Sequence, residues 1–404
     1  MIPVAGLPQV MALRDVDEVR RLLAGMRVSM AGMDIMDKKA LFRVVRIKGL
    51  DPRAVSILKQ EMLSRGGEVA TSREVYEMKG RTADCLMMGT LAQYERLLPK
   101  LRAQPFGLRP LADAIAAALG NRDSQRPVCH PGLDLSCRPR VMGIVNVTPD
   151  SFSDGGDAFD TAAAVAMGER LAEEGAAILD LGGESTRPGA DSVGPEEEIA
   201  RVIPVIQALV PHVDVPLSVD TYKASVAARA LEVGAFMVND ISALRMDPEM
   251  VAVVRDADCP VVLVHMLGEP RNMQVDPHYE DVVDDVYSFF VERLTWAIDQ
   301  GLKEENLLID PGIGFGKNLE HNLTLLQNLG GFRSLGRPVV LGASRKAWLG
   351  RVLDLPEAKD RMAGTVATTV VAALQDVDVV RVHDVRANVE AVRVLRAIYP
   401  QRDE

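Results

Sequence analysis

The chain has 404 residues, of which 48% are apolar and 25% are charged, as in an ordinary globular protein. Lys and Arg number 46 against 57 Asp and Glu, so the net charge is −11. This charge argues against a general nucleic-acid or anionic-membrane binder, because such partners would be repelled by the protein as a whole. Only 4% of the residues are aromatic, too few to favour serial stacking of bases.

Targeting and redox signals are weak in this sequence. The N-terminus lacks a basic stretch followed by an apolar core, and the longest apolar run, residues 363–374, is too short to span a bilayer. The four cysteines form no CxxC pair and no cluster with zinc spacing. We therefore expect a soluble, cytoplasmic protein that binds small molecules, with neither nucleic acid nor membrane as a partner.

Residues 1–120 predict a small α+β domain. Strands are expected over 41–50, 68–71 and 83–89, with a further strand near Phe106, and helices over 52–64, 91–101 and 110–119. This order is typical of a ferredoxin-like sandwich. Residues 121–136 are polar and contain two prolines, which indicates a linker, and a short strand is expected over 133–137.

Residues 137–404 alternate short β-rich runs with helical stretches. Eight strands are expected, at 141–147, 178–181, 217–219, 236–239, 261–266, 307–309, 339–342 and 379–383. Eight β/α units in this length favour a (β/α)8 TIM barrel. A doubly wound open sheet is the alternative, but it normally has fewer strands and carries a nucleotide fingerprint that this sequence lacks.

Polar residues follow every one of the eight predicted strands. In chain order they are Asn146, Glu184 to Arg187, Asp220, Asn239 with Asp240, His265, Asp310 to Lys317, Ser344 to Lys346, and Arg381 to Asp384. Single residues of this kind are commonly helix caps or turn residues, and His265 taken alone is more typical of a satisfied buried histidine than of a ligand. Because a TIM barrel places its active site at the carboxyl ends of its strands, eight such ends together predict a site.

The residue types at these ends indicate the ligand chemistry. Carboxylates and an amide at Asp220, Asn239 and Asp310 match the edge of a flat, nitrogen-rich heterocycle, since a carboxylate accepts two parallel N–H bonds. Arg345, Lys346, Arg381 and His383 follow the last two strands, where TIM barrels often hold a phosphate, so we expect an anion site there rather than solvated surface charges. Arg187, Arg381 and His383 near the rim could hold a pyrophosphate. The Asn146 amide oxygen is a ligand of the kind Mg²⁺ prefers. The acidic run at 196–198 is expected to be the solvated first turn of a helix.

Several motifs at these positions resemble dihydropteroate synthase. They are MGIVNVTPDSFSDGG (142–156), LDLGGESTRPG (179–189), SVDTY (218–222), VNDIS (238–242), VHMLGEPRNMQ (264–274), DPGIGFGK (310–317), GASRK (342–346) and RVHDV (381–385). The resemblance covers essentially all of residues 137–404 and none of residues 1–120. Ile313 stands where phenylalanine is common in the family.

The resemblance implies a transferase of folate biosynthesis that joins 6-hydroxymethyl-7,8-dihydropterin pyrophosphate to p-aminobenzoate and releases pyrophosphate. It implies that Asp220, Lys346, Arg381 and His383 are catalytic. The substrate-binding set that it implies is Thr186, Arg187, Pro188, Asp220, Asn239, Met266, Asp310, Phe315, Gly342, Lys346, Arg381 and His383. Within that set Thr186, Arg187 and Pro188 would help to form the p-aminobenzoate pocket.

The resemblance also implies a Mg²⁺ cofactor on Asn146 and a homodimer. Mg²⁺, Arg381 and His383 would stabilise the leaving pyrophosphate, and Asp220 the pterin-stabilised cation that remains. Two other functions are compatible with a pterin-binding barrel: a methyltransferase domain acting between a folate and a corrinoid, and a non-catalytic pterin-binding protein. A methyltransferase has no pyrophosphate to hold, and a decayed site would have lost charged residues, so both are less favoured.

Overall fold

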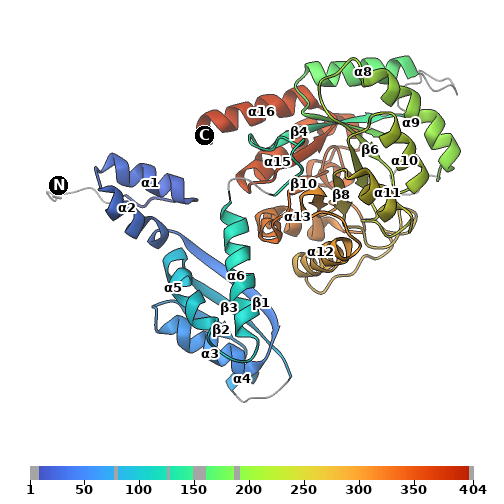
Figure 1. Cartoon of the computed structure of the whole chain (residues 1–404). Coiled ribbons are helices and arrows are strands. Elements are labelled where there is room, and N and C mark those ends of the chain that lie inside the picture. Colours follow the sequence, from blue (N-terminus) through green and yellow to red (C-terminus); the bar gives the residue numbers. More distant parts are fainter. Residues whose placement is uncertain (1–8, 77–80, 125–127, 149–160, 186–191, 400–404) are drawn as a thin grey trace. The chain divides into compact units, whose positions relative to one another are not determined.

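The computed structural model describes residues 9–76, 81–124, 128–148, 161–185 and 192–399 (Figure 1). The chain divides into two compact units, Met1–Asp123 and Ser124–Glu404. No helix in the described ranges combines the length and the hydropathy that a bilayer span requires.

The first unit is an α+β domain with a three-stranded sheet. Its elements are α1 (Val16–Gly25), α2 (Met30–Met36), the 3-10 helix η1 (Asp37–Lys39), β1 (Phe42–Leu50), α3 (Pro52–Leu63), β2 (Glu68–Thr71), α4 (Arg73–Tyr76), β3 (Ala83–Thr90), α5 (Leu91–Leu101) and α6 (Leu108–Asp123). The helix starts follow from their caps. The Asp51 side chain accepts the Arg53 N–H at 2.8 Å, and Thr90 and Gln93 form a reciprocal capping box.

The sheet order is β1-β3-β2, with β3 antiparallel to both neighbours, and one hydrophobic core joins the sheet to α3, α5 and α6. The order matches the first three strands of a ferredoxin-like sheet. The strand expected near Phe106 was wrong: Phe106 lies in a turn with φ of 60°, followed by Gly107 at 76° and then by α6. Positive φ is incompatible with extended strand geometry, so the described residues of this unit form no fourth strand.

The second unit is a TIM barrel, as the sequence predicted. Its strands are β4 (Arg140–Asn146), β5 (Ile178–Gly182), β6 (Leu217–Asp220), β7 (Met237–Asp240), β8 (Val261–Val264), β9 (Leu307–Asp310), β10 (Val340–Leu341) and β11 (Val379–Val382). All the paired strands are parallel, in the order β10-β11-β4-β5-β6-β7-β8-β9. A parallel bridge between Ile309 and Val339 joins the two ends, so the sheet closes and the open-sheet alternative is excluded.

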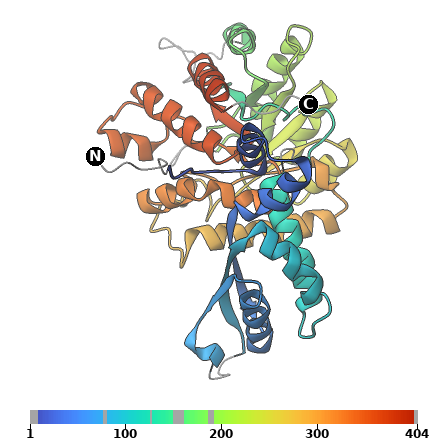
Figure 2. The same cartoon turned by 90° about the vertical axis from the view of Figure 1, so that its left-hand side faces the viewer.

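Helices surround these strands (Figure 2). They are α8 (Thr161–Glu173), α9 (Pro195–Leu209), α10 (Ala224–Glu232), α11 (Met250–Ala257), α12 (Val282–Asp299), α13 (Leu319–Gln327), α14 (Ala347–Leu353), α15 (Met362–Leu374) and α16 (Val385–Ile398), with 3-10 helices η2 (Glu304–Asn306), η3 (Leu329–Leu335) and η4 (Ala358–Arg361). One large core lies between strands and helices, and a second cluster joins inward-facing strand residues to Leu133 and Leu135.

The segment leading into the barrel is irregular. The strand expected over 133–137 was wrong, because these residues form bends and irregular backbone without strand pairing. Leu133 and Leu135 are nevertheless buried, at 4% and 3% exposed, against the inward-facing residues of the barrel strands. The apolar residues that suggested a strand are therefore buried, but their side chains pack into the barrel and their backbones do not pair with a strand.

Candidate active site

Four polar residues from four strands meet inside the carboxyl end of the barrel. Arg381 of β11 donates from Nε to Asp180 of β5 at 2.5 Å and from Nη2 to Asp220 of β6 at 2.6 Å. Asn239 of β7 donates from its amide nitrogen to the same Asp180 oxygen at 3.0 Å. The structure therefore brings the predicted residues Asp220, Asn239 and Arg381 together around a carboxylate that the sequence analysis did not single out.

This cluster contains two carboxylates for one guanidinium. Burial, with a smaller contribution from the neighbouring charge of Asp180, raises the pKa of Asp220 to about 7 against the opposing effect of Arg381. Both carboxylates raise the pKa of Arg381 against the opposing effect of burial, so the guanidinium stays charged. The second oxygen of Asp180 is buried and has no hydrogen-bond partner among the described residues. Such an orphaned acceptor suits a ligand that brings N–H groups.

Asp180 could have been found from the sequence. It is a carboxylate in the middle of the apolar run Ile178–Gly182, every residue of which is buried. A fully buried Asp is rare unless it is paired. The missing information was which residue pairs with it, because Arg381 lies 201 positions away in the chain.

A second group of predicted residues surrounds Asp310 and Lys346. The Asp310 carboxylate accepts the backbone N–H of Gly312 at 2.7 Å and that of Gly342 at 3.1 Å. Lys346 donates to the backbone carbonyl of Ile313, and its Nζ lies 4.1 Å from the centroid of the Phe315 ring. Burial lowers the pKa of Lys346 to about 8, with a counteracting effect from Asp310. An ammonium next to a carboxylate and an aromatic face offers both charge and stacking to a flat ring.

A third group links the ends of β10 and β11. Ser344 Oγ lies 2.9 Å from His383 Nδ1 and accepts the His383 backbone N–H at 3.1 Å. Next to them Arg345 has φ of 56° and donates from Nε to Asp384 at 2.9 Å. These paired contacts hold the two strand ends together and place His383 on the same barrel mouth as Arg381, where the sequence predicted an anion site.

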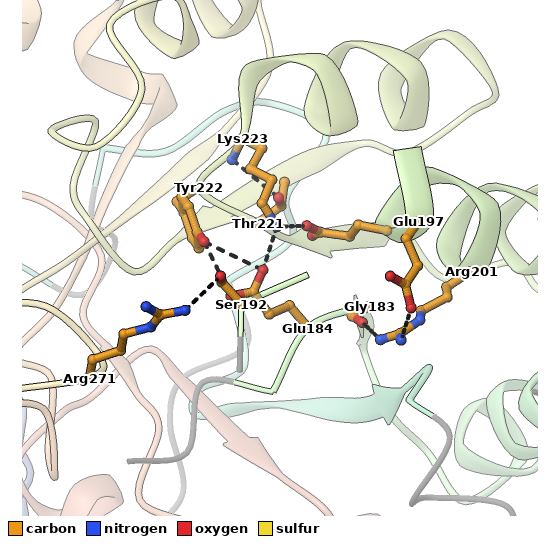
Figure 3. A network of polar contacts seen from close by, with 10 residues as sticks. Gly183, Glu184, Ser192, Glu197, Arg201, Thr221, Tyr222, Lys223 and Arg271 are labelled. Atoms are coloured by element: carbon orange, nitrogen blue, oxygen red, sulfur yellow. Dashed lines mark hydrogen bonds and ion pairs between the residues drawn. The ribbon is translucent and has the colours of Figure 1, made fainter. Parts of the chain in front are cut away.

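A polar network follows β5 and β6 (Figure 3). Lys223 donates to both Glu184 and Glu198, and Tyr222 Oη donates to Glu184 at 3.1 Å. The expectation that residues 196–198 are a solvated turn was wrong for Glu198, which is 1% exposed. The N-terminus of α9 faces the loop after β6, so Glu198 is buried against Lys223. Burial raises the pKa of Glu198, and its hydrogen bond to Lys223 opposes that rise.

Met266 lies directly beyond β8, 1% exposed, and its carbonyl accepts a hydrogen bond from Arg245 at 2.7 Å. His265 is 5% exposed and is in contact with Lys317, which confirms the expectation of a satisfied buried histidine. Thr186, Arg187 and Pro188 lie outside the described residues.

The predicted Mg²⁺ site has one protein candidate. Asn146 is the last residue of β4, and it pairs with Gly182 of β5. No group of three or more His, Cys, Asp or Glu side chains able to hold a metal exists in the described part of the chain. The Mg²⁺ site stays a prediction, with Asn146 as its expected protein ligand and substrate phosphates and water as the others.

Comparison with known proteins supports a relationship across most of the chain. The model of the pterin binding enzyme family matches residues 142–383. A probable bifunctional folylpolyglutamate synthase/dihydropteroate synthase of Halobacterium salinarum is 42% identical over 381 residues, which are 94% of this chain and 46% of that protein. The chain thus spans about half the length of this relative, and the match includes most of the first unit.

Other relatives match about two thirds of the chain. The dihydropteroate synthase of Escherichia coli is 45% identical over 265 residues, 66% of this chain and 93% of that protein. The structure of Xanthomonas albilineans dihydropteroate synthase with 4-aminobenzoic acid has a TM-score of 0.62 at 50% identity, covering 66% of this chain and 94% of that one. The same enzyme in complex with 7,8-dihydropteroate gives 0.61 at 46% identity, with 69% and 100% coverage. The chain therefore belongs to the pterin-binding enzyme family that includes the dihydropteroate synthases.

Proposed function

We propose that this chain is a dihydropteroate synthase, a transferase that joins 6-hydroxymethyl-7,8-dihydropterin pyrophosphate to p-aminobenzoate. The observation that carries the proposal is the buried cluster of Asp180, Asp220, Asn239 and Arg381, together with Asp310 and Lys346. It combines acceptors for the N–H groups of a pterin with cations for a pyrophosphate. The similarity to a dihydropteroate synthase of Escherichia coli, and to the Xanthomonas albilineans enzyme in complex with 7,8-dihydropteroate, supports the assignment.

In the proposed reaction the bond between the pterin methylene carbon and the pyrophosphate oxygen breaks, and its electron pair leaves with the oxygen. The carboxylate of Asp220 stabilises the cation that remains on the pterin. Arg381 holds its Nε and Nη2 on Asp180 and Asp220, which leaves Nη1 for the leaving group. His383, held by Ser344, adds a second donor for the same anion. The p-aminobenzoate nitrogen then forms the new C–N bond and loses a proton.

Lys346 and Asp310 bind the pterin ring in this proposal. Asp310 is fixed by two backbone N–H groups, so its carboxylate keeps one orientation when the ligand enters. Lys346 lies against the Phe315 ring, and its lowered pKa means that the ammonium loses its proton more readily than an ordinary lysine does. A Cβ at Gly342 would lie 3.2 Å from an Asp310 oxygen, so a larger residue there would press on this carboxylate. Met266 and Asn239 complete the pocket.

Asn146 is the residue that would hold Mg²⁺, with the remaining ligands supplied by the pyrophosphate and water. When bound, Mg²⁺ would neutralise charge that builds up on the leaving pyrophosphate. Thr186, Arg187 and Pro188 are proposed to form the p-aminobenzoate pocket. Support comes from Glu184, two residues before them, which Tyr222 and Lys223 hold at the mouth of the barrel (Figure 3).

The alternatives have less support. A methyltransferase that moves a methyl group from a folate has no pyrophosphate to bind, so it would not need the Ser344–His383 contact beside Lys346 and Arg381. A non-catalytic binding protein would not need to keep the guanidinium of Arg381 buried between two carboxylates at a cost in stability.

We also propose a homodimer and a cytoplasmic location. Exposed apolar residues lie on α14 and α15, namely Val352, Leu353, Met362, Val371 and Leu374, and they would suit a symmetric contact between two copies. Sedimentation velocity on the purified chain tests the dimer. All four cysteines are free thiols, which is the usual state in a reducing compartment. Fractionation of cells that express the chain tests the location.

The test of the activity is pyrophosphate release by the purified full chain with Mg²⁺ and the dihydropterin pyrophosphate, with and without p-aminobenzoate. Release that depends on p-aminobenzoate, and falls by at least about 100-fold in Lys346→Ala, supports the synthase. Lys303→Ala is the matched control, because this exposed lysine pairs with Asp258 on the surface. Pterin binding without release would overturn the proposal in favour of a binding protein or a methyltransferase.

A further inference from the structure

The loop after β9 is built from alternating glycines that pass very close to their neighbours. Gly312, Gly314 and Gly316 have φ of 69°, 83° and 61°. A Cβ on Gly312 would lie 1.9 Å from the His265 carbonyl oxygen, and one on Gly316 would lie 2.5 Å from the Leu267 carbonyl oxygen. Loop 312–317 is therefore pressed against the segment that follows β8, in a backbone conformation that favours glycine.

Lys317 ends this loop and points back into it. The residue is 2% exposed, and its Nζ lies 2.8 Å from His265 Nδ1, 3.0 Å from the Phe315 carbonyl oxygen and 3.5 Å from the His265 carbonyl oxygen. An ammonium has three donors, and these three acceptors match them in number. One side chain thus ties both segments together at the place where their backbones are closest.

No carboxylate forms an ion pair with Lys317 in the described ranges, which is unusual for a buried lysine. Burial and the charge of Lys346 lower its pKa well below the ordinary value, while Asp310 opposes the change. Burial and Lys317 likewise lower the pKa of His265, so the imidazole is neutral at neutral pH. The ring packs edge-on against Phe289, with centroids 4.8 Å apart. Retaining a buried lysine without an anionic partner is costly, even when its donors are hydrogen-bonded, which calls for a role.

Lys346 contacts the same loop. The Ile313 carbonyl accepts a hydrogen bond from Lys346, and the Phe315 ring lies under its Nζ at 4.1 Å. A Cβ on Gly314 would lie 2.9 Å from Lys346 Cδ. Tyr279 fastens the outer side of the loop by donating to the Gly316 carbonyl at 2.9 Å. Lys317, Tyr279 and Lys346 therefore all contact this loop, through three different backbone carbonyls.

We propose that Lys317 is a positioning residue: through His265 and the Phe315 carbonyl it fixes loop 312–317, and the loop in turn fixes Lys346 for pterin binding. This inference rests on the proposed function, because it names what the loop does for the pterin site. Lys317 itself contacts no reacting atom, and p-aminobenzoate binding is independent of it.

The experiment compares Lys317→Met, which keeps the length of the side chain but removes all donors, with Lys317→Gln, which keeps two. Binding of 6-hydroxymethylpterin is measured by calorimetry on the purified full chain, and KM is measured for both substrates. Lys317→Met is expected to weaken pterin binding and raise the dihydropterin KM by about tenfold, the effect of losing one or two buried hydrogen bonds. Lys317→Gln is expected to recover part of the loss, and the p-aminobenzoate KM is expected to change less than about twofold.

The pH dependence of pterin binding gives a readout that a purely structural role would not move. Burial and the charge of Arg381 lower the pKa of Lys346 to about 8, while Asp310 and Asp220 oppose the change. Lys317 also lies close enough for its charge to interact with that of Lys346. In the wild type, pterin binding is therefore expected to weaken above pH 8 as Lys346 loses its proton. In Lys317→Met the ammonium is less confined, so this limb is expected to move upward, toward the ordinary value of 10.5.

Two further variants keep the test decisive. Tyr279→Phe removes one hydrogen bond behind the loop without opening a cavity, and a loss of pterin affinity of about twofold to fivefold is expected even if Lys317→Met does not fold. Lys303→Met is the matched surface control and is expected to behave as the wild type. An equal rise in KM for both substrates would overturn the positioning role. So would a folded Lys317→Met in which pterin binding weakens over the same alkaline pH range as in the wild type. A wild type that binds no pterin would instead overturn the proposed function.

Discussion

The two ends of the barrel each bury an Arg–Asp cluster, and the clusters differ in how completely their acceptors are used. At the amino-terminal end both oxygens of Asp378 accept hydrogen bonds, one from Arg138 and Arg333 at 3.2 Å each and the other from the Val339 N–H at 2.8 Å. At the carboxyl-terminal end, one oxygen of Asp180 accepts from Arg381 and Asn239, while the other has no partner among the described residues.

The difference separates a structural cluster from a ligand site. Asp378 has two guanidinium groups for one carboxylate, and a backbone N–H fixes its second oxygen. Asp180 and Asp220 share a single guanidinium, and the pKa of Asp220 is raised to about 7. A closed network stabilises the fold once it is made, whereas an open one keeps unused acceptors at a cost that a ligand can offset. Charge content alone does not distinguish them, since both clusters are Asp with Arg.

The largest effect is expected for the Asp378 cluster at the amino-terminal end of the barrel. Asp378→Ala leaves Arg138 and Arg333 buried without their carboxylate, so the unfolding free energy is expected to fall by about 3–5 kcal/mol. Urea unfolding measures the loss, with Asp360→Ala on the surface as the control, expected within about 0.5 kcal/mol of the wild type. Activity per folded molecule is expected to be unchanged. A loss of activity without a loss of stability would remove the contrast between the two ends.

Asp220→Asn, at the carboxyl-terminal end of the barrel, is expected to lose activity but not stability. kcat/KM is expected to fall by about 100- to 1,000-fold, since a charge that acts on the transition state is removed. Stability is expected to rise at pH 7. The folded pKa is raised from 3.8 to about 7, so the folded state binds more protons than the unfolded state across that interval. The cost of this group therefore grows as pH rises through the interval, and the gain in the variant is expected to vanish near pH 4.

Urea unfolding at several pH values, together with steady-state kinetics, measures both halves of this prediction. Asp360→Asn is the surface control. A variant that is less stable at neutral pH and keeps its activity would show that Asp220, like Asp378, serves to stabilise the fold.

The smallest expected effect is a shift in a pH profile. kcat/KM for the dihydropterin substrate is expected to fall below pH 7 as Asp220 takes up a proton. Asp180→Asn keeps an acceptor for Arg381 but removes a negative charge that raises the pKa of Asp220. The acid limb is therefore expected to move to lower pH, by about one unit. Profiles of kcat/KM for both proteins test this, and an unmoved or raised limb would show that the two carboxylates are not coupled.

Much of the fold followed from local patterns. The eight barrel strands are short apolar runs with polar residues at or just beyond their carboxyl ends. Their order along the chain predicted the barrel, since parallel strands with intervening helices have few ways to close. The first unit was harder. Its fourth strand was inferred from position alone near Phe106, where a left-handed turn stands instead. Similarly, Leu133 and Leu135 are buried by packing rather than by strand pairing.

The candidate site was predictable to the extent that it follows strand ends. Asp220, Asn239, Asp310, Lys346 and Arg381 were all identified from their places after apolar runs, and the structure groups them at one end of the barrel. The role of these residues in binding and catalysis stays a prediction until the variants above are measured.

The sequence by itself determined the strand count, the end of the barrel that carries the polar residues and the kinds of group found there, because hydrophobic periodicity and turn chemistry are local properties. The tertiary structure decided which charges are paired. Asp180 and Arg381 are 201 positions apart, and Lys317 and His265 are 52 apart. Both oxygens of Asp378 have hydrogen-bond partners, whereas one oxygen of Asp180 has none among the described residues. This difference depends on groups from distant strands, and no local pattern encodes those contacts.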